Sequence, residues 1–323
     1  MIFMINGFTA ESWRVKLLGI PVEDAYYMDE HVGTIAVADG VSRDWDLTRN
    51  KLTIPFKYEK PSHAKIAADL FTHVSLSVLR DFIVKDQRAI IEAYRRSNEA
   101  IGNYARQQGI TPENTDYLLR DLPGCVSSLA VLNKNAIYYG FIADCGVALV
   151  DARGNLLLKT PDEGPNSVDK DKHIWSEIRE TLGERAGWSM PEARKMQRSQ
   201  FRNNPKEGNS YGVLTGEKNA LYYLKTGTIE VKPEYTLLVY TDGVEPILFL
   251  KDVGGGDIRG EVADFIRNRD FCGIERLCKK NVKSEGTLAY GLFESELDKE
   301  MTRTWQASAR AERRRLFEND NGF

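Results

Sequence analysis

Two short apolar runs that each end in Asp-Gly constrain the fold of this 323-residue chain more than any other feature. The first covers residues 34–42 (TIAVADGVS) and the second covers residues 236–244 (TLLVYTDGV). β-Branched and aromatic residues dominate both runs, which predicts two strands that end at Asp39 and Asp242. The glycine allows a tight backbone after each carboxylate. If the two ends meet in space, they form an oxygen-rich pocket suited to Mg²⁺ or Mn²⁺.

Taken alone, an Asp-Gly pair after a strand more often indicates a hairpin turn than a metal site. The neighbouring acidic residues bear on that choice. Glu23 and Asp24 open what reads as another strand, and this strand leads into the one that ends at Asp39. A hairpin of these two strands would bring the acidic pair close to Asp39, although on their own Glu23 and Asp24 are better explained as turn carboxylates in water.

The remaining hydrophobic patterns predict a mixture of strands and two long helices, with Ser62 as the N-cap of the first helix. A run of hairpin-linked strands after the helices favours antiparallel sheet. We expect strands over residues 12–18, 21–28, 127–132, 136–144, 147–151, 156–158, 220–224, 228–231, 236–240 and 287–293, and helices over 63–84, 87–107 and 260–269.

Composition excludes several classes of protein. Hydrophobic residues make up 42% and charged residues 28% of the chain, as in soluble globular proteins. The net charge of −3 offers no basic field for nucleic acid. No apolar run approaches the roughly 18–20 residues that span a bilayer, so we expect no membrane partner. The four cysteines form no C-x-x-C pair and the first residues lack a basic signal region, which favours free thiols and the cytoplasm.

Residues 160–210 differ from the rest of the chain. They are polar, contain four prolines and carry helical stretches near 172–184 and 190–202. Loops of this length in a compact domain are usually functional or mobile. We therefore expect one domain over residues 1–295 with an insertion at its rim over about 160–210, followed by a charged helical tail over 296–323.

The order of these features resembles the metal-dependent type 2C protein serine/threonine phosphatases in their bacterial form. The resemblance covers roughly residues 12–293. It rests on the acidic pair at 23–24, VADGVS at 37–42, two long helices, GCVSS at 124–128, IADCG at 142–146, YGVLTGE at 211–217, YTDGV at 240–244 and GTL at 286–288.

This resemblance implies an α+β fold, a four-layer α-β-β-α sandwich with two antiparallel sheets, and two Mn²⁺ or Mg²⁺ ions between the sheet edges. Asp39 would bridge both metals, the Gly40 carbonyl would bind one of them, and Asp242 would bind the other. Glu23 or Asp24 would complete the first site, directly or through waters. The choice between these two acidic residues stays open.

Two further parts of this chain resemble features of the family. Asp144 resembles the carboxylate that supports a third, weaker metal, and residues 165–210 resemble the flap beside the active site. Two carboxylate-held cations neutralise a phosphomonoester and activate water for in-line attack without a covalent intermediate. The lack of Cys/His ligand spacing argues against zinc.

The last metal ligand of the family is replaced in this chain. The family usually carries an Asp-Asp or Asp-Asn pair just before the threonine of the last strand, and the first aspartate binds metal. The corresponding stretch here is Ser284-Glu285-Gly286-Thr287, and by register Ser284 stands in the place of that ligand. Glu285 is one residue later and has a longer side chain, so it is the candidate substitute. If Glu285 does not reach the ion, one metal site is weakened.

Two other family residues are also missing. Gly19 stands where many members have the arginine that holds the substrate phosphate, and Arg14 or Lys16 on the preceding strand is a candidate replacement. Both can equally be surface charges. Val41 stands where some members have a histidine after the Asp-Gly pair, which leaves a water to protonate the leaving group.

The sequence therefore predicts a phosphatase that removes phosphate from phosphoserine or phosphothreonine on proteins, with a serine/threonine kinase as its natural counterpart. The replacements at Ser284 and Gly19 motivate an alternative, a pseudophosphatase that binds a phosphoprotein or partner without turnover. A third hypothesis keeps the fold and assigns a small phosphomonoester as substrate, because fold alone does not exclude it.

Overall fold

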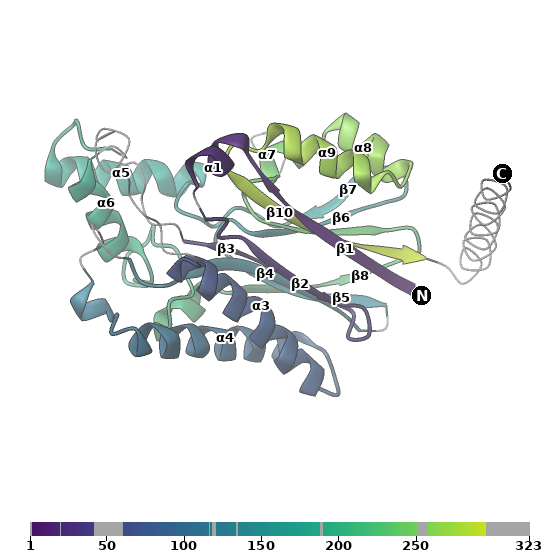
Figure 1. Cartoon of the computed structure of the whole chain (residues 1–323), viewed down its shortest axis with the longest axis horizontal. Helices are drawn as coiled ribbons and strands as arrows, with labels where there is room; N and C mark the ends of the chain where they lie inside the picture. The colour runs from purple at the N-terminus through teal and green to yellow at the C-terminus, as the bar shows by residue number, and fades with distance from the viewer. Residues whose placement is uncertain are drawn as a thin grey trace, which may run out of the picture.

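Two five-stranded antiparallel sheets pack face to face in the computed structural model, with helices on both outer faces (Figure 1). The structure describes residues 2–19, 21–41, 61–115, 117, 121–133, 135–187, 190–250 and 257–294. One sheet has the order β1 (Ile2–Glu11), β10 (Glu285–Glu294), β9 (Thr236–Tyr240), β6 (Gly146–Val150) and β7 (Leu156–Lys159). The other has the order β2 (Ala25–Asp29), β3 (Thr34–Gly40), β4 (Cys125–Asn133), β5 (Ala136–Ile142) and β8 (Lys225–Glu230).

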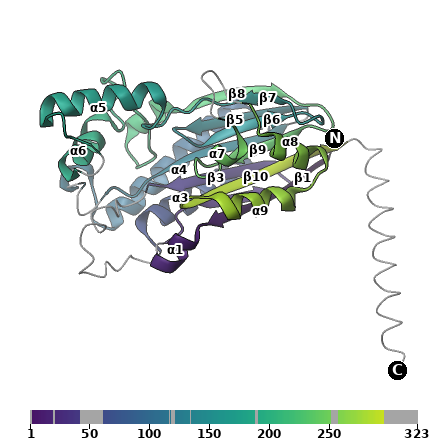
Figure 2. The same ribbon diagram turned by 90° about the horizontal axis from the view of Figure 1, so that it is seen from above.

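Helices form the two outer layers, as the views in Figures 1 and 2 agree. α3 (His63–Asp81) and α4 (Gln87–Gln107) cover the second sheet. α7 (Glu245–Leu248), α8 (Gly260–Arg267) and α9 (Phe271–Asn281) cover the first. α5 (Val168–Leu182) and α6 (Pro191–Met196) lie beyond the end of the sandwich, on the left in Figure 1. The expected α-β-β-α sandwich with antiparallel sheets is confirmed.

Strand β3 shows why the first Asp-Gly run is so apolar. Ile35 and Val37 point between the sheets, whereas Ala36 and Ala38 point toward the α3–α4 layer, and all four are fully buried. A strand that is buried on both faces reads as a continuous apolar run instead of an alternating one. The polar residue at its end, Asp39, is therefore placed by the burial of the residues before it.

The segment expected as a first strand is a helix, so that prediction was wrong. α1 (Trp13–Leu18) begins where the Ser12 side chain accepts a hydrogen bond from the Val15 N–H at 3.4 Å, and it ends at Gly19 with a left-handed φ of 64°. These are N-cap and C-cap signals, and they override the weak alternation of a short segment. The first strand, β1, lies earlier in the chain and pairs with β10 along its whole length.

Other boundaries also differ from expectation. Residues 220–223, expected in a strand, lie in a 3-10 helix, Lys218–Tyr223, and Leu224 is its C-cap. The prediction was wrong because a five-residue apolar run carries too little periodicity to separate helix from strand. β5 ends at Ile142 because Ala143 adopts a φ of 62°. α9 had no counterpart among the expected helices. The expected tail over 296–323 lies outside the described residues, and the expected domain limits stay a prediction.

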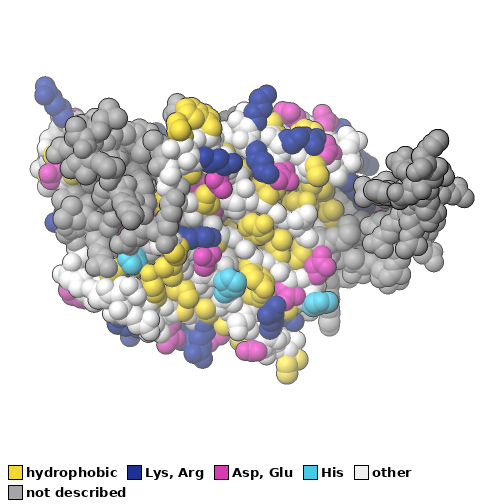
Figure 3. Space-filling model, in the orientation of Figure 1, with side chains coloured by type: hydrophobic (Ala, Val, Ile, Leu, Met, Phe, Trp, Pro, Cys, Tyr) yellow, Lys and Arg dark blue, Asp and Glu magenta, His cyan; other side chains and the backbone are white. Residues whose placement is uncertain are grey.

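The surface carries both signs of charge. On the face drawn in Figure 3, the Lys and Arg side chains of the described residues are interspersed with Asp and Glu. This mixture agrees with the small net charge of −3. Across the described residues, every helix is too short or too polar to cross a membrane.

Candidate metal centre

Strand ends bring several carboxylates to one end of the sandwich. Asp24 directly precedes β2 and Asp39 lies at the end of β3, and the antiparallel pairing of Ala25 with Ala38 places the two acids side by side. In the other sheet, Asp242 follows β9 and Glu285 begins β10, again at a shared end. Asp24, Asp39 and Glu285 each offer a carboxylate oxygen within 4.8 Å of the others. We call this group the acidic cluster.

Thr241 connects the two sheets at this cluster, and sequence reasoning missed it. Its hydroxyl donates to Asp24 Oδ2 at 2.8 Å and accepts the Thr287 N–H at 2.8 Å. The Thr241 N–H donates to the Thr287 carbonyl at 3.0 Å. Its position directly before Asp242 was the available signal, but only the packed sheets reveal what the hydroxyl contacts.

Glu285 reaches the position that the sequence left in doubt. Both of its carboxylate oxygens accept the Glu23 N–H, at 2.9 and 3.1 Å. Ser284 is exposed, and its backbone carbonyl accepts the Ser12 N–H at 2.7 Å. Ser284 precedes β10, whereas Glu285 is its first residue. Of these two neighbours, Glu285 is thus the one whose side chain belongs to the acidic cluster.

Glu23 plays a different part from Asp24. The Ser62 hydroxyl at the start of α3 donates to Glu23 Oε1 at 2.5 Å, and the expected N-cap bond from Lys65 N–H to Ser62 Oγ is present at 3.1 Å. Glu23 is buried but is not a member of the group within 4.8 Å. Of the acidic pair, Asp24 is therefore the one that belongs to the acidic cluster.

Glycines allow the close approaches that build the site. A Cβ at Gly40 would lie 2.9 Å from the Ala64 backbone and from the Glu23 side chain. A Cβ at Gly243 would overlap the Glu285 carbonyl. The first glycine lets the start of α3 reach the end of β3, and the second lets the end of β9 reach the start of β10. The Gly40 carbonyl as a metal ligand stays a prediction.

The pKa values of the acidic residues are raised, which favours the binding of cations beside them. Burial, followed by the charges of Asp24, Asp242, Asp144 and Glu285, raises the pKa of Asp39 well above its usual range. Burial raises the pKa of Asp24 to about 6 and that of Glu285 to about 9, and it also raises the pKa values of Asp144 and Asp242. Buried carboxylates this close cannot all ionise without compensating charge. An all-oxygen donor set of this kind fits Mg²⁺ or Mn²⁺.

Asp144 lies in the β5–β6 turn beside a second acid that sequence reasoning missed. After burial, the charges of Asp242 and Asp162 are the main causes that raise the pKa of Asp144. The chain after β7 packs tightly here, since a Cβ at Gly164 would lie 2.9 Å from Asp144 Oδ2. Asp162 itself accepts the Gly164 N–H at 2.7 Å. Asp162 therefore extends the negative charge on the side of Asp144.

Both candidate phosphate-binding residues lie on α1, and the structure describes the side chain of one of them, Lys16. Gly19 closes α1, and Lys16 on that helix is exposed. Arg14 also lies on α1, and its side chain falls outside the part of the chain that the structure describes. Lys65 contacts the backbone beside the cluster, because its Nζ donates to the Asp24 carbonyl at 2.8 Å. Val41 is half-buried beyond Gly40.

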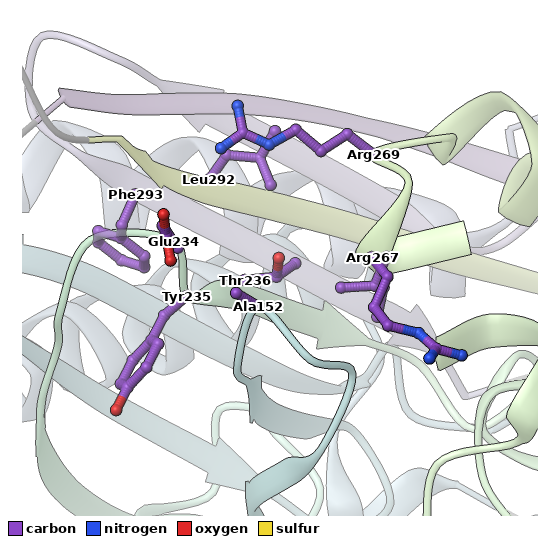
Figure 4. Close-up of a pocket in the computed structure, with 9 residues that line it drawn as sticks. Ala152, Glu234, Tyr235, Thr236, Arg267, Arg269, Leu292 and Phe293 are labelled. Carbon is purple, nitrogen blue, oxygen red and sulfur yellow. The ribbon is translucent and has the colours of Figure 1, made fainter. Parts of the chain in front are cut away.

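A cavity of about 200 Å³ lies at the opposite end of the sheets (Figure 4). It opens where β9 begins and β10 ends, between Thr236, Leu292 and the turn that holds Glu234. Strands β9 and β10 separate it from Asp242 and Glu285, which lie at their other ends. This cavity is therefore not part of the acidic cluster.

No protein-family model matches the sequence, and no curated protein matches it by sequence. Solved structures share its fold. The Mycobacterium tuberculosis serine/threonine phosphatase PstP/Ppp aligns with a TM-score of 0.55 at 14% identity, over 91% of this chain and 100% of that chain. The catalytic domain of PstP in complex with 2 manganese ions gives 0.53 at 15% identity, over 91% and 99%. The S. agalactiae serine/threonine phosphatase gives 0.53 at 13% identity, over 90% and 100%.

Proposed function

We propose that this chain, which has the fold of the bacterial metal-dependent serine/threonine phosphatases, is itself a phosphatase that acts on phosphoserine and phosphothreonine in proteins. The observation that carries the proposal is the acidic cluster of Asp24, Asp39 and Glu285, with Asp242 and Asp144 beside it. A structure of this fold has been solved with 2 manganese ions, which supports metal binding by these acids.

The acidic residues divide into two groups around Asp39. Asp24 and Glu285 would hold one divalent cation with Asp39, and Asp242 would hold a second, with the Gly40 carbonyl and Glu23 completing the first site. Asp144 would support a third, weaker ion. When bound, such cations neutralise phosphoryl oxygens and lower the pKa of a coordinated water. Mn²⁺ and Mg²⁺ both suit these oxygen ligands.

The surrounding residues orient the acids. Thr241 fixes one oxygen of Asp24, which leaves the other directed away from the hydroxyl. Both carboxylate oxygens of Glu285 accept the Glu23 N–H, so the segment that holds Glu23 and Asp24 is bonded to the first residue of β10. Partners of this kind set the orientation of metal ligands and their affinity for the metal.

Phosphorylated proteins are the proposed substrates, and a serine/threonine kinase is the proposed counterpart. Neighbours of this fold are described as serine/threonine phosphatases, and one of them, PppA, as a key regulatory component of the T6SS in Pseudomonas aeruginosa, with a TM-score of 0.51. The four cysteines are free, and we keep the cytoplasm as the proposed location.

A pseudophosphatase is the second candidate. The observations that favour it are Gly19 at the place of the phosphate-binding arginine and Ser284 at the place of the last aspartate. Such a protein would bind a phosphoprotein at the acidic cluster and release no phosphate.

The deciding experiment measures phosphate release from a phosphothreonine peptide with Mn²⁺, with Mg²⁺ and with EDTA. We expect metal-dependent release that the Asp39→Asn variant loses while it stays folded. The same loss in Asp242→Asn would support the second cation site. A folded wild-type protein without release under any metal would reject the phosphatase and favour the binding protein.

A further inference from the structure

A buried charge pair fastens the rim segment, which we define as residues 160–210, to the body of the protein. The side chains of Asp121 and Arg202 are only 6% and 2% exposed, and Arg202 Nη2 donates to Asp121 Oδ1 at 2.9 Å. Arg198 adds a second contact, with its Nε 3.4 Å from Asp121 Oδ2. Helix α6 continues into a π-helical turn, Gln197–Phe201, which contains Arg198 and is followed directly by Arg202, so both arginines contact the same carboxylate.

Tyr117 receives the same two arginines. The Arg202 guanidinium lies over its ring at 5.0 Å from the centroid, and Arg198 Nη1 donates to its carbonyl at 3.2 Å. The planar, delocalised guanidinium suits such stacked and forked contacts, which an ammonium group cannot reproduce. Each arginine therefore holds the chain before β4 at two points, Tyr117 and Asp121.

Asp121 keeps its charge in this buried place. Burial alone would raise its pKa, but the charges of Arg202 and Arg198 hold the pKa below its usual value. Removing one partner of a buried ion pair leaves the other charge uncompensated, which is strongly unfavourable. The contact between Asp121 and the arginines is thus one that the protein cannot lose without moving the rim segment.

The segment held by the arginines also touches the end of β3. Three residues after Asp121, the Gly124 carbonyl accepts the Val41 N–H at 2.9 Å, and Val41 follows the Asp39-Gly40 pair. The next residue, Cys125, exchanges two backbone hydrogen bonds with Leu214, at 3.1 and 2.9 Å. One short segment therefore joins the residue that follows the Asp39-Gly40 pair to Leu214, which lies shortly after the rim segment. Figure 1 shows α5 and α6 at this end of the sheets.

We propose that Asp121, with Arg202 and Arg198, forms a latch that seats the rim segment beside the acidic cluster and so positions protein substrates. The inference rests on the proposed phosphatase function. The carboxylates of the cluster lie on the sheets and need no part of the rim segment to hold a cation. A phosphoprotein must extend over the rim, whereas a small aryl phosphate contacts little beyond the cluster. Asp121 is therefore a positioning residue that discriminates between these two kinds of substrate.

The test compares Asp121→Asn with Asp29→Asn. Asp29 is a matched control because it is also a buried carboxylate, 8% exposed, that pairs with arginine: it accepts two hydrogen bonds from Arg80, at 2.6 and 2.9 Å. It lies at the far end of β2 from Asp24. Three quantities are measured for each variant: amide hydrogen exchange over residues 190–214, kcat/KM for a phosphothreonine peptide, and kcat/KM for p-nitrophenyl phosphate.

We expect Asp121→Asn to speed exchange over residues 190–214 and to lower kcat/KM for the peptide by at least about tenfold, chiefly through KM, because small displacements of a positioning surface are costly. The rate with p-nitrophenyl phosphate should change by less than about threefold, as should all rates of Asp29→Asn. An equal loss with both substrates, or unchanged exchange and peptide turnover, would overturn the latch.

Arg202→Lys provides a second variant if Asp121→Asn does not fold. It keeps the positive charge but loses the fork and the stacking on Tyr117, so we expect the same split between substrates in weaker form. A wild-type protein that releases no phosphate with any metal would defeat the proposed function and the substrate role of the latch. Amide hydrogen exchange would then still test whether the latch holds the rim segment in place. Unchanged exchange over residues 190–214 in both variants would reject that role.

Discussion

The Thr241 hydroxyl donates a hydrogen bond to Asp24 Oδ2 at 2.8 Å, although the two residues flank strands of different sheets and lie 217 positions apart. The Thr241 hydroxyl oxygen also accepts the Thr287 N–H. The Thr241 side chain therefore connects Asp24, beside β2, to β9 and β10 of the other sheet. Asp24 thus owes its orientation to the packing of the sheets, which makes the metal centre sensitive to a residue that is not itself an acid.

Thr241→Val tests this connection. Valine keeps the shape and removes the hydroxyl, which leaves the Thr287 N–H and one oxygen of Asp24 without this partner in a buried place. We expect the free energy of unfolding to fall by about 1–3 kcal/mol and Mn²⁺ affinity to weaken by about tenfold or more. Thr241→Ser, which retains the oxygen, should stay close to wild type in urea unfolding and Mn²⁺ titration. Equal behaviour of the two variants would show that the hydroxyl contributes nothing.

Glu285→Gln tests the substitute ligand. The amide oxygen of glutamine can still accept the Glu23 N–H, so the variant removes charge with little change of shape. We expect Mn²⁺ to bind at least about tenfold more weakly, measured by calorimetry on the metal-free protein. Ser284→Ala is the matched control, because Ser284 is exposed and only its backbone carbonyl is used. Loss of affinity in Ser284→Ala with full affinity in Glu285→Gln would reverse the assignment.

The acidic residues show which parts of the site could be predicted from the sequence. Asp39 and Asp242 could be predicted as strand ends because the apolar runs before them are buried on both faces and the Asp-Gly pairs bound them. The alternation of side chains along β10 could also have favoured Glu285 over Ser284, since Thr287 and Glu285 share a face. Family register pointed to Ser284 instead.

Other features depend on contacts that no local pattern contains. α1 is helical because Ser12 and Gly19 cap a segment of six residues, too short for a reliable period. The role of Thr241 requires both sheets to be in place. Arg202 reads as a surface charge in a polar segment, and only its partner Asp121, 81 positions earlier, explains its burial.

The raised pKa values predict how the stability of the metal-free protein depends on pH. Burial raises the pKa of Asp24 to about 6 and that of Glu285 to about 9, whereas unfolded carboxyl groups titrate near about 4. The folded state therefore binds more protons than the unfolded state between these values, and the free energy of unfolding falls as the pH rises from about 4 to about 9.

Thermal unfolding in EDTA at pH 5, 7 and 9 measures this dependence. We expect the melting temperature to fall with pH in EDTA and the stabilisation by added Mg²⁺ to grow with pH, because metal binding displaces protons from the acids. Asp39→Asn should flatten the fall in EDTA, since it removes one of the interacting charges. A melting temperature in EDTA that rises from pH 5 to pH 9 would contradict the proton linkage.

Gly243→Ala tests the contact between the ends of β9 and β10. A Cβ at this position would overlap the Glu285 carbonyl, and backbone on both strands would have to shift to make room. We expect the free energy of unfolding to fall by about 1–3 kcal/mol and Mn²⁺ affinity to fall with it, because the shift separates Asp242 from Glu285. Gly260→Ala is the control, since no described residue has an atom within 4 Å of a Cβ built there. If urea unfolding and Mn²⁺ titration gave the same values for both variants, the two strand ends would not need this close approach, and the metal centre would tolerate a wider spacing between its two sheets.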